Sequence, residues 1–254
     1  MRKTLDQVFS QRAEGIDTIF TSYSTLYQIY IGGLKAMNVN KNTLQAIQNA
    51  KDSVEQEQKK ISNQLHVQGF ILLTGAAEAL LKDVFVCLLR ENFNQISLPA
   101  SINFSASEIQ EVIKAHEGQP QALSELSSEL GGLTVKKIYS SKNPIEKINF
   151  QNVATTRQVL EQYFGIKFID SDYLKRVHRY WQVRHTLIHN AGIIDERFLH
   201  NVKQVSLLAR GEKVGSQVKV AKKQFDEAEE DFLKLFNELD QLVIGTGLNC
   251  SLIA

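Results

Sequence analysis

The sequence predicts an all-α protein, and three observations support that fold class. Apolar residues recur every three or four positions over most of the 254 residues, which is the period of an amphipathic helix. Only three prolines interrupt these runs. The alternation typical of strands is confined to "GSQVKV", which predicts a small β-ribbon near residues 213–220. Because 43% of the residues are apolar and 22% are charged, we expect a globular protein and predict a single domain over residues 1–254.

Two long helices are predicted in the first part of the chain. Apolar positions between 4 and 31 indicate the first helix, which Gly32 and Gly33 are expected to end. Residues 43–94 indicate the second helix. Its first half, 50–64, is polar and predicts a surface that faces solvent or a partner. Its second half is apolar nearly all round and predicts a central, buried helix.

The second part of the chain is predicted to begin with an insertion and to continue with helices. Residues 98–150 contain irregular stretches punctuated by glycine and proline, and they are predicted to be an insertion into a helical core. Further helices are predicted at residues 155–164, 173–190, 196–202 and 222–243. Asp170 or Ser171 should cap the second of these helices, Gly192 should end it, and Asp195 should cap the third.

Charge, cysteine content and hydropathy exclude several classes of protein. A formal net charge of +1 provides no global basic field, so any binding to nucleic acid requires a local patch. Cys87 and Cys250 are too few to form a disulfide framework. The most apolar segment, from Gly69, is interrupted by Glu78 and Lys82 before the roughly 18 apolar residues that a membrane span needs. We therefore expect a soluble cytoplasmic protein that is not bound to a membrane.

The stretch "RHTLIHNAGIID", residues 184–195, concentrates polar side chains and allows three interpretations. In the first, arginine and histidine merely stabilise a helix C-terminus through the helix dipole. In the second, His185 and His189 are four residues apart and His178 falls on the same helical stripe, which resembles a zinc site. However, Thr186 follows His185, so the motif lacks the glutamate of HExxH metalloenzymes.

The third interpretation is acid–base chemistry on a phosphate. An arginine fork binds phosphate oxygens, and histidine exchanges protons near neutral pH, so an RNA 2′-hydroxyl could attack its own phosphate without a metal or a cofactor. Arg184 and His189 are five residues apart, which separates them by about 140° around an ideal helix. A two-fold dimer would pool both residue types in one cleft.

Four sequence segments resemble HEPN domains. "RHTLIH" at 184–189 resembles the R-x4-H motif of that family. Residues 69–85 are similar to its earlier core helix, which carries an acidic residue among apolar ones. Residues 163–199 resemble the segment around the motif, and residues 215–243 resemble the closing strand and helix of several members.

The resemblance implies a HEPN-like helical bundle that dimerises through the motif helices. It implies metal-independent endoribonuclease activity, found in many members that act as toxins, antiviral effectors or RNA-processing enzymes. Arg184 and His189 would be the catalytic pair, and His185 would support them at a position that is frequently Asn or Asp in the family. The expected partners are RNA, a second copy of the chain, and an antitoxin or regulatory protein. Alternatively, the chain is an inactive module of the same fold that binds RNA, nucleotide or a protein through residues such as 50–64.

Other residues are candidates for RNA contact. Lys175 and Arg179 alternate with aromatic residues that include Trp181, a pattern that suits single-stranded RNA. The alternative places Trp181 in the core. Asn190 is predicted either to contact RNA or to cap the helix end.

Glu78 is a candidate supporting residue. It is the only charged residue between His66 and Lys82, and a carboxylate among apolar residues needs a partner because burying it alone is costly. We expect it to orient Arg184 or a motif histidine, or else to face a small solvent gap.

Overall fold

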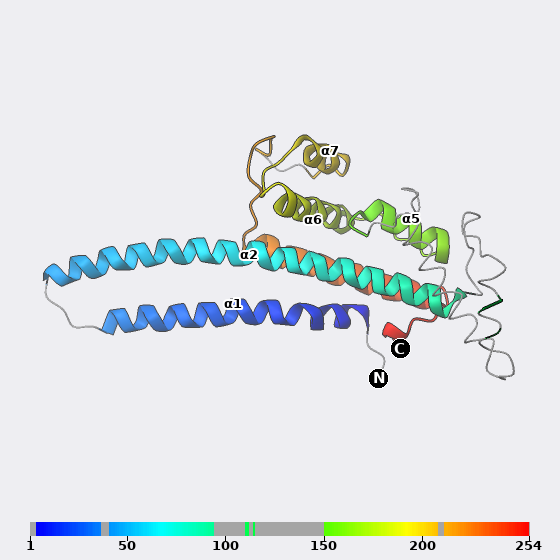
Figure 1. Ribbon diagram of the computed structural model, residues 1–254, viewed down its shortest axis with the longest axis horizontal. Coiled ribbons are helices and arrows are strands. Elements are labelled where there is room, and N and C mark those ends of the chain that lie inside the picture. Colours follow the sequence, from blue (N-terminus) through cyan, green and yellow to red (C-terminus); the bar gives the residue numbers. More distant parts are fainter. Residues whose placement is uncertain are drawn as a thin grey trace. The chain divides into compact units, whose positions relative to one another are not determined.

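The computed structural model describes residues 4–36, 41–93, 110–111, 114, 150–207 and 211–253. The helices in this part of the chain are α1 (Leu5–Ala36), α2 (Lys41–Glu91), α5 (Val153–Phe164), α6 (Asp172–His189), α7 (Glu196–Gln204), α8 (Lys222–Gly245) and the short 3-10 helix η2 (Ser251–Ile253) (Figure 1). The predicted all-α class is therefore confirmed.

Glycine does not end the first helix where the sequence predicts. Helix α1 continues through Gly32 and Gly33 as far as Ala36. Glycine inside a helix costs only about 1 kcal/mol relative to alanine, so it weakens a helix without necessarily ending it. The other predicted helices agree with the structure to within a few residues at each end.

The predicted β-ribbon is wrong. Residues 211–220 contain no strand, and they form one isolated antiparallel bridge, between Ile193 and Gln217. The physical reason is the length of the pairing partner, because only residues 190–194 lie between the end of α6 at His189 and the cap of α7 at Asp195. Backbone bonds from Ile194 to Ser216 and from Gly215 to Ile194, at 2.8 and 2.9 Å, complete the pairing.

The described chain falls into two compact units, each built from segments distant in sequence. Unit 1 consists of residues 1–9, 77–181 and 231–254, and unit 2 of residues 10–76 and 182–230. The sequence predicted a single domain over 1–254. Helical periodicity does not reveal the two units, because their boundaries fall inside helices and leave the periodic pattern unbroken. The predicted insertion at 98–150 lies almost wholly outside the described residues.

The predicted burial of the second half of α2 holds for most of its surface. In unit 1, Phe85 of α2 is fully buried, and its ring lies 5.5 to 5.6 Å from those of Phe150, Tyr163 and Phe164. The adjacent Lys82 and Asp83 are exposed, so one face of the helix meets solvent. None of the helices in the described ranges is long and apolar enough to cross a membrane.

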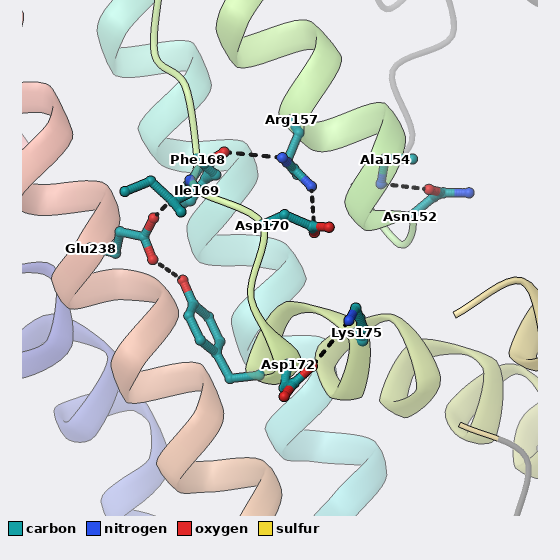
Figure 2. Close-up of polar contacts among 10 residues, drawn as sticks. Asn152, Ala154, Arg157, Phe168, Ile169, Asp170, Asp172, Lys175 and Glu238 are labelled. Carbon is teal, nitrogen blue, oxygen red and sulfur yellow. Dashed lines mark hydrogen bonds and ion pairs between the residues drawn. The ribbon is translucent and has the colours of Figure 1, made fainter. Parts of the chain in front are cut away.

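The turn between α5 and α6 is held by side chains within unit 1 (Figure 2). Arg157 donates to the carbonyl of Phe168 at 3.0 Å and pairs with Asp170 at 3.2 Å. Glu238 of α8 accepts the backbone N–H of Ile169 at 3.3 Å and the hydroxyl of Tyr173. Asp170 therefore helps to fix the turn, and because α6 begins at Asp172, Ser171 rather than Asp170 occupies the cap position. These contacts define where α6 begins and hence where its last turn lies.

The C-terminal segment is attached to the end of α2. The amide of Asn92 donates to the carbonyl of Asn249 at 2.7 Å and accepts its N–H at 2.8 Å. Cys87 lies 3.4 Å from the hydroxyl of Ser251. Cys87 and Cys250 are both buried and free.

Candidate functional site

The last two turns of α6, in unit 2, carry the residues that the sequence singled out. Thr186 is buried, whereas His189 is exposed. The N–H groups of Asn190 and Gly192 both donate to the carbonyl of Thr186 at 3.0 Å, which closes the helix. Gly192 has a φ of 81°, in the left-handed region that glycine tolerates, so it ends α6 as predicted. The helix therefore delivers its final histidine to the surface.

The two motif histidines form a contacting pair. The ring centroids of His185 and His189 are 4.6 Å apart, with an angle of 47° between the ring planes. Their four-residue spacing predicts this contact, because i and i+4 lie on the same helix face. His185 is half-buried and His189 is exposed. The pair therefore has one sheltered ring and one accessible ring.

Burial lowers the pKa of His185 below its usual 6.5. Repulsion by His189 and by Arg197 lowers this pKa further, while the carboxylate of Asp195 opposes the shift. At neutral pH His185 is consequently a neutral imidazole with a nitrogen lone pair able to accept a proton. Such a group is suited to a base, or to orienting a neighbouring donor.

Asp195 organises the segment that follows the motif. Its carboxylate caps α7 by accepting the N–H of Phe198 at 2.7 Å, as the sequence predicts, and it also accepts the side-chain amide of Asn190 at 2.7 Å. The backbone bond from Phe198 is the main cause that lowers the pKa of Asp195. Asn190 therefore serves to hold the end of α6 against the start of α7. Its predicted contact with RNA stays a prediction.

Arg184 lies beside helix α2 within unit 2. Its side chain is half-buried, and a Cβ added to Gly75 would come within 3.9 Å of its Nη2 atom. Because α6 is helical from Asp172 to His189, Arg184 and His189 are separated by about 140° around its axis. One copy of the helix therefore presents the arginine and the exposed histidine on different faces.

The three-histidine stripe is not part of a cluster of potential metal ligands within the described residues. His178 is buried, at 7% exposure, whereas His189 is exposed. In the part of the chain that the structure describes, no three His, Cys, Asp or Glu residues come close enough together to bind a metal ion. The stripe is a regularity of spacing on a helix rather than a set of convergent ligands.

The predicted RNA-contact residues on the first half of α6 have different surroundings. Trp181 is 3% exposed, and its ring centroid lies 6.1 Å from that of Phe232 in unit 1. A base has no access to that ring, so the core alternative applies to Trp181. Lys175 is paired with Asp172 at 3.0 Å on the surface, and Arg179 is half-buried. RNA contact by these two cations stays a prediction.

Glu78 accepts two hydrogen bonds from the amide of Gln151, at 2.9 and 3.0 Å, within unit 1. It is half-buried. The amide supplies one of the partners that a carboxylate in an apolar helix requires. The expectation that Glu78 orients Arg184 or a motif histidine stays a prediction.

Sequence reasoning missed the charges around His185. Arg197 and Asp195 act on its pKa in opposite directions, and both stand in the dozen residues after the imidazole. Both charged residues stand in "HNAGIIDER", close to the motif in sequence. Helix periodicity does not show that the turn at Gly192 brings them back toward the end of α6.

Comparisons of the chain with protein-family models, with curated proteins and with solved structures gave no match. The resemblance of residues 184–189 to the HEPN motif therefore remains an expectation.

Proposed function

We propose that the protein is a metal-independent endoribonuclease whose site is centred on the last turn of α6. The observation that carries this proposal is the His185–His189 pair, with ring centroids 4.6 Å apart and one ring accessible. General acid–base cleavage needs groups that exchange protons near neutral pH, and two adjacent imidazoles with different surroundings are such groups.

The proposed chemistry is intramolecular attack by the RNA 2′-hydroxyl. A neutral imidazole takes the 2′-hydroxyl proton, the oxygen attacks phosphorus, and the 5′-oxygen leaves with a proton from an imidazolium. His189 is the accessible proton carrier, and neutral His185 supports it. Arg184 stabilises the negative charge that builds on the phosphate oxygens. The products would carry a 2′,3′-cyclic phosphate and a 5′-hydroxyl.

The separation of Arg184 and His189 around α6 supports a site made by two copies of the chain. Two such helices facing each other across a two-fold axis would place the arginine of one copy near the histidines of the other. Mixing the Arg184→Ala and His189→Ala proteins tests this arrangement, because a mixed dimer keeps one intact arginine and one intact histidine. Partial recovery of cleavage is the expected result. Two inactive proteins that stay inactive after verified subunit exchange would contradict the shared site.

The reaction itself is tested with matched oligonucleotides. An RNA and the same strand with 2′-deoxyribose at the cleaved position are incubated with the protein in EDTA. We expect the RNA alone to be cut, and mass spectrometry to find a cyclic phosphate on its 5′ fragment. Cleavage of the deoxy strand, or loss of activity in EDTA that added zinc restores, would refute the proposal.

A second candidate is an inactive binding module of the same architecture, restrained or recruited by a protein partner such as an antitoxin. The observation that favours it is the polar segment of α2, because none of residues 52–64 is buried. A helix that is polar all round serves as a solvated surface or a partner surface. The candidates separate cleanly, since the module binds RNA or protein without producing a cyclic phosphate.

A further inference from the structure

A pocket of about 680 Å³ opens in unit 2 beside the end of α6. Residues 60–68 of α2 form one wall, Leu187 and Ala191 form another, and Gln217 and Val218 close it. This volume lies within the roughly 300–1,000 Å³ typical of small-molecule sites. Leu187 lies about 60° from Arg184 around the axis of α6 and about 160° from His185 and His189, so the pocket adjoins the proposed phosphate-binding arginine. We call it the amide pocket.

The lining of the amide pocket has a distinctive chemistry. Its apolar part consists of Ile61, Leu65, Val67, Leu187, Ala191 and Val218. Its polar part consists of four side-chain amides and one lysine: Asn63, Gln64, Gln68, Gln217 and Lys60. These amides are exposed and form no hydrogen bond with another described residue. No acidic or aromatic side chain lines the pocket among the residues described.

The polar residues of α2 reach the pocket because of their spacing. Lys60, Gln64 and Gln68 are four residues apart and therefore form one stripe along the helix. Each amide carries one acceptor and two donors, so the stripe offers both hydrogen-bond donors and acceptors to a ligand in the pocket.

The part of the pocket formed by Gln217 and Val218 is joined by backbone hydrogen bonds to the turn that follows α6. Val218 donates its N–H to the carbonyl of Gly192 at 2.8 Å, and Gln217 forms the bridge to Ile193. A Cβ added to Gly192 would lie 3.7 Å from Cγ of Gln217 and 3.5 Å from a methyl group of Leu187. The side chain of Gln217 thus lies against the turn that ends α6, a few residues from His189.

We infer that the amide pocket binds a nucleobase of the RNA next to the scissile phosphate, an inference that rests on the proposed function. A flipped-out base is held between apolar side chains and read by hydrogen bonds along its edge, and this pocket supplies both. A side-chain amide matches adenine best, because its oxygen and nitrogen pair with N6 and N7 together. The pocket offers no carboxylate to accept the N1 and N2 donors of guanine. Lys60 supplies one positive charge for the adjoining phosphate.

The test measures binding of the four nucleoside 5′-monophosphates to the full chain by NMR titration. AMP should bind most tightly and should shift the side-chain amide signals of Gln64 and Gln217. The double variant Gln64→Leu/Gln217→Leu keeps side-chain volume and removes two hydrogen-bonding groups, so it should weaken AMP binding about tenfold. Gln56→Leu, an exposed position of α2 outside the pocket, is the matched control and should bind AMP like the wild type.

The outcomes separate this inference from the proposed function. If the double variant binds AMP as tightly as the wild type, or if no nucleotide shifts the pocket amides, the base pocket is refuted even if RNA is cut. If AMP binds in the pocket but the wild type cuts no RNA, the nuclease proposal fails and the base pocket stands. With both correct, the double variant raises KM for adenine-containing RNA and leaves kcat close to that of the wild type.

Discussion

The two halves of helix α6 carry similar residues in contrasting surroundings. In the first half, Asp172–Trp181 in unit 1, the guanidinium of Arg176 makes two bonds to Asp231, at 2.6 and 2.7 Å, and Asp231 also accepts the hydroxyl of Tyr180 at 2.8 Å. Asp231 is 3% exposed. In the second half, Gln182–His189 in unit 2, the imidazoles of His185 and His189 form a pair, and His189 is exposed at the surface.

The contrast separates polar residues that hold the fold from polar residues that reach the surface, where we propose that the chemistry takes place. A buried carboxylate must keep its cation, so Arg176 is committed to the fold. An exposed histidine on the last turn contributes little burial, so selection for the fold alone does not require it. We therefore expect substitutions in the first half to change stability and substitutions in the second half to change activity.

The largest expected effect is a lower rate of RNA cleavage in variants of the second half of α6. His189→Ala removes the proton carrier and should lower the rate roughly 10²–10⁴-fold. Arg184→Ala removes a charge partner of the phosphate and should lower it roughly 10²–10³-fold. Single-turnover cleavage of RNA measures both rates, and circular dichroism checks that each protein is folded.

The matched control for the histidine is His200→Ala, an exposed position on α7 of the same unit. It should cut RNA at the wild-type rate. If His200→Ala and His189→Ala lose activity equally, or if neither loses any, the site is not at the end of α6.

The first half should respond through the free energy of unfolding. Arg176→Met leaves the buried carboxylate of Asp231 without its two-point partner, which should cost about 3 kcal/mol. Urea unfolding followed by circular dichroism measures the loss. Lys175→Met, which breaks an exposed pair on the same turn, should leave the unfolding midpoint unchanged. An Arg176 variant as stable as the wild type would remove the contrast between the halves.

The sequence anticipates features that depend on neighbours along one helix. The contact of His185 with His189 and the end of α6 at Gly192 both follow from local spacing and backbone preference. Features that depend on distant segments were wrong or left open between alternatives. The ribbon at 213–220 fails because its partner is too short, and the burial of Trp181 depends on Phe232, which is far along the chain.

The amide pocket could not be predicted for the same reason. Gln64 and Gln217 meet in one lining only after the chain has folded, and neither belongs to a motif. Periodicity assigns Gln64 to an exposed helix face, which the structure bears out, but it does not show what lies opposite that face.

A smaller effect concerns the titration of His185. Its imidazole should titrate below pH 6.5 in the wild type, as followed by NMR of the ring protons. His189→Gln removes a repulsive charge and should raise this pKa, whereas Asp195→Asn keeps a helix cap but removes an attractive charge and should lower it. Shifts of the same sign in both variants would contradict the arrangement of charges around the ring.

The lowered pKa of His185 also makes the free energy of unfolding depend on pH. Because the pKa of His185 is lower in the folded state, the unfolded chain takes up this proton first as the pH falls through about 6.5. The contribution of His185 to the free energy of unfolding therefore decreases toward acidic pH and is constant above neutrality. His185→Gln should flatten that part of the pH dependence.

The smallest expected effect tests whether the first half of α6 contacts RNA at all. Lys175 is paired only with exposed Asp172 in the described structure, so its ammonium group can exchange that partner for a phosphate. If it does, Lys175→Met should leave stability and the cleavage rate at saturating RNA unchanged, while the slope of log binding constant against log salt falls by about 0.7. Fluorescence anisotropy with a 2′-O-methyl RNA, which cannot be cut, measures the slope. An unchanged slope would show that Lys175 does not contact RNA, since the counterion that Lys175 would release is then never displaced.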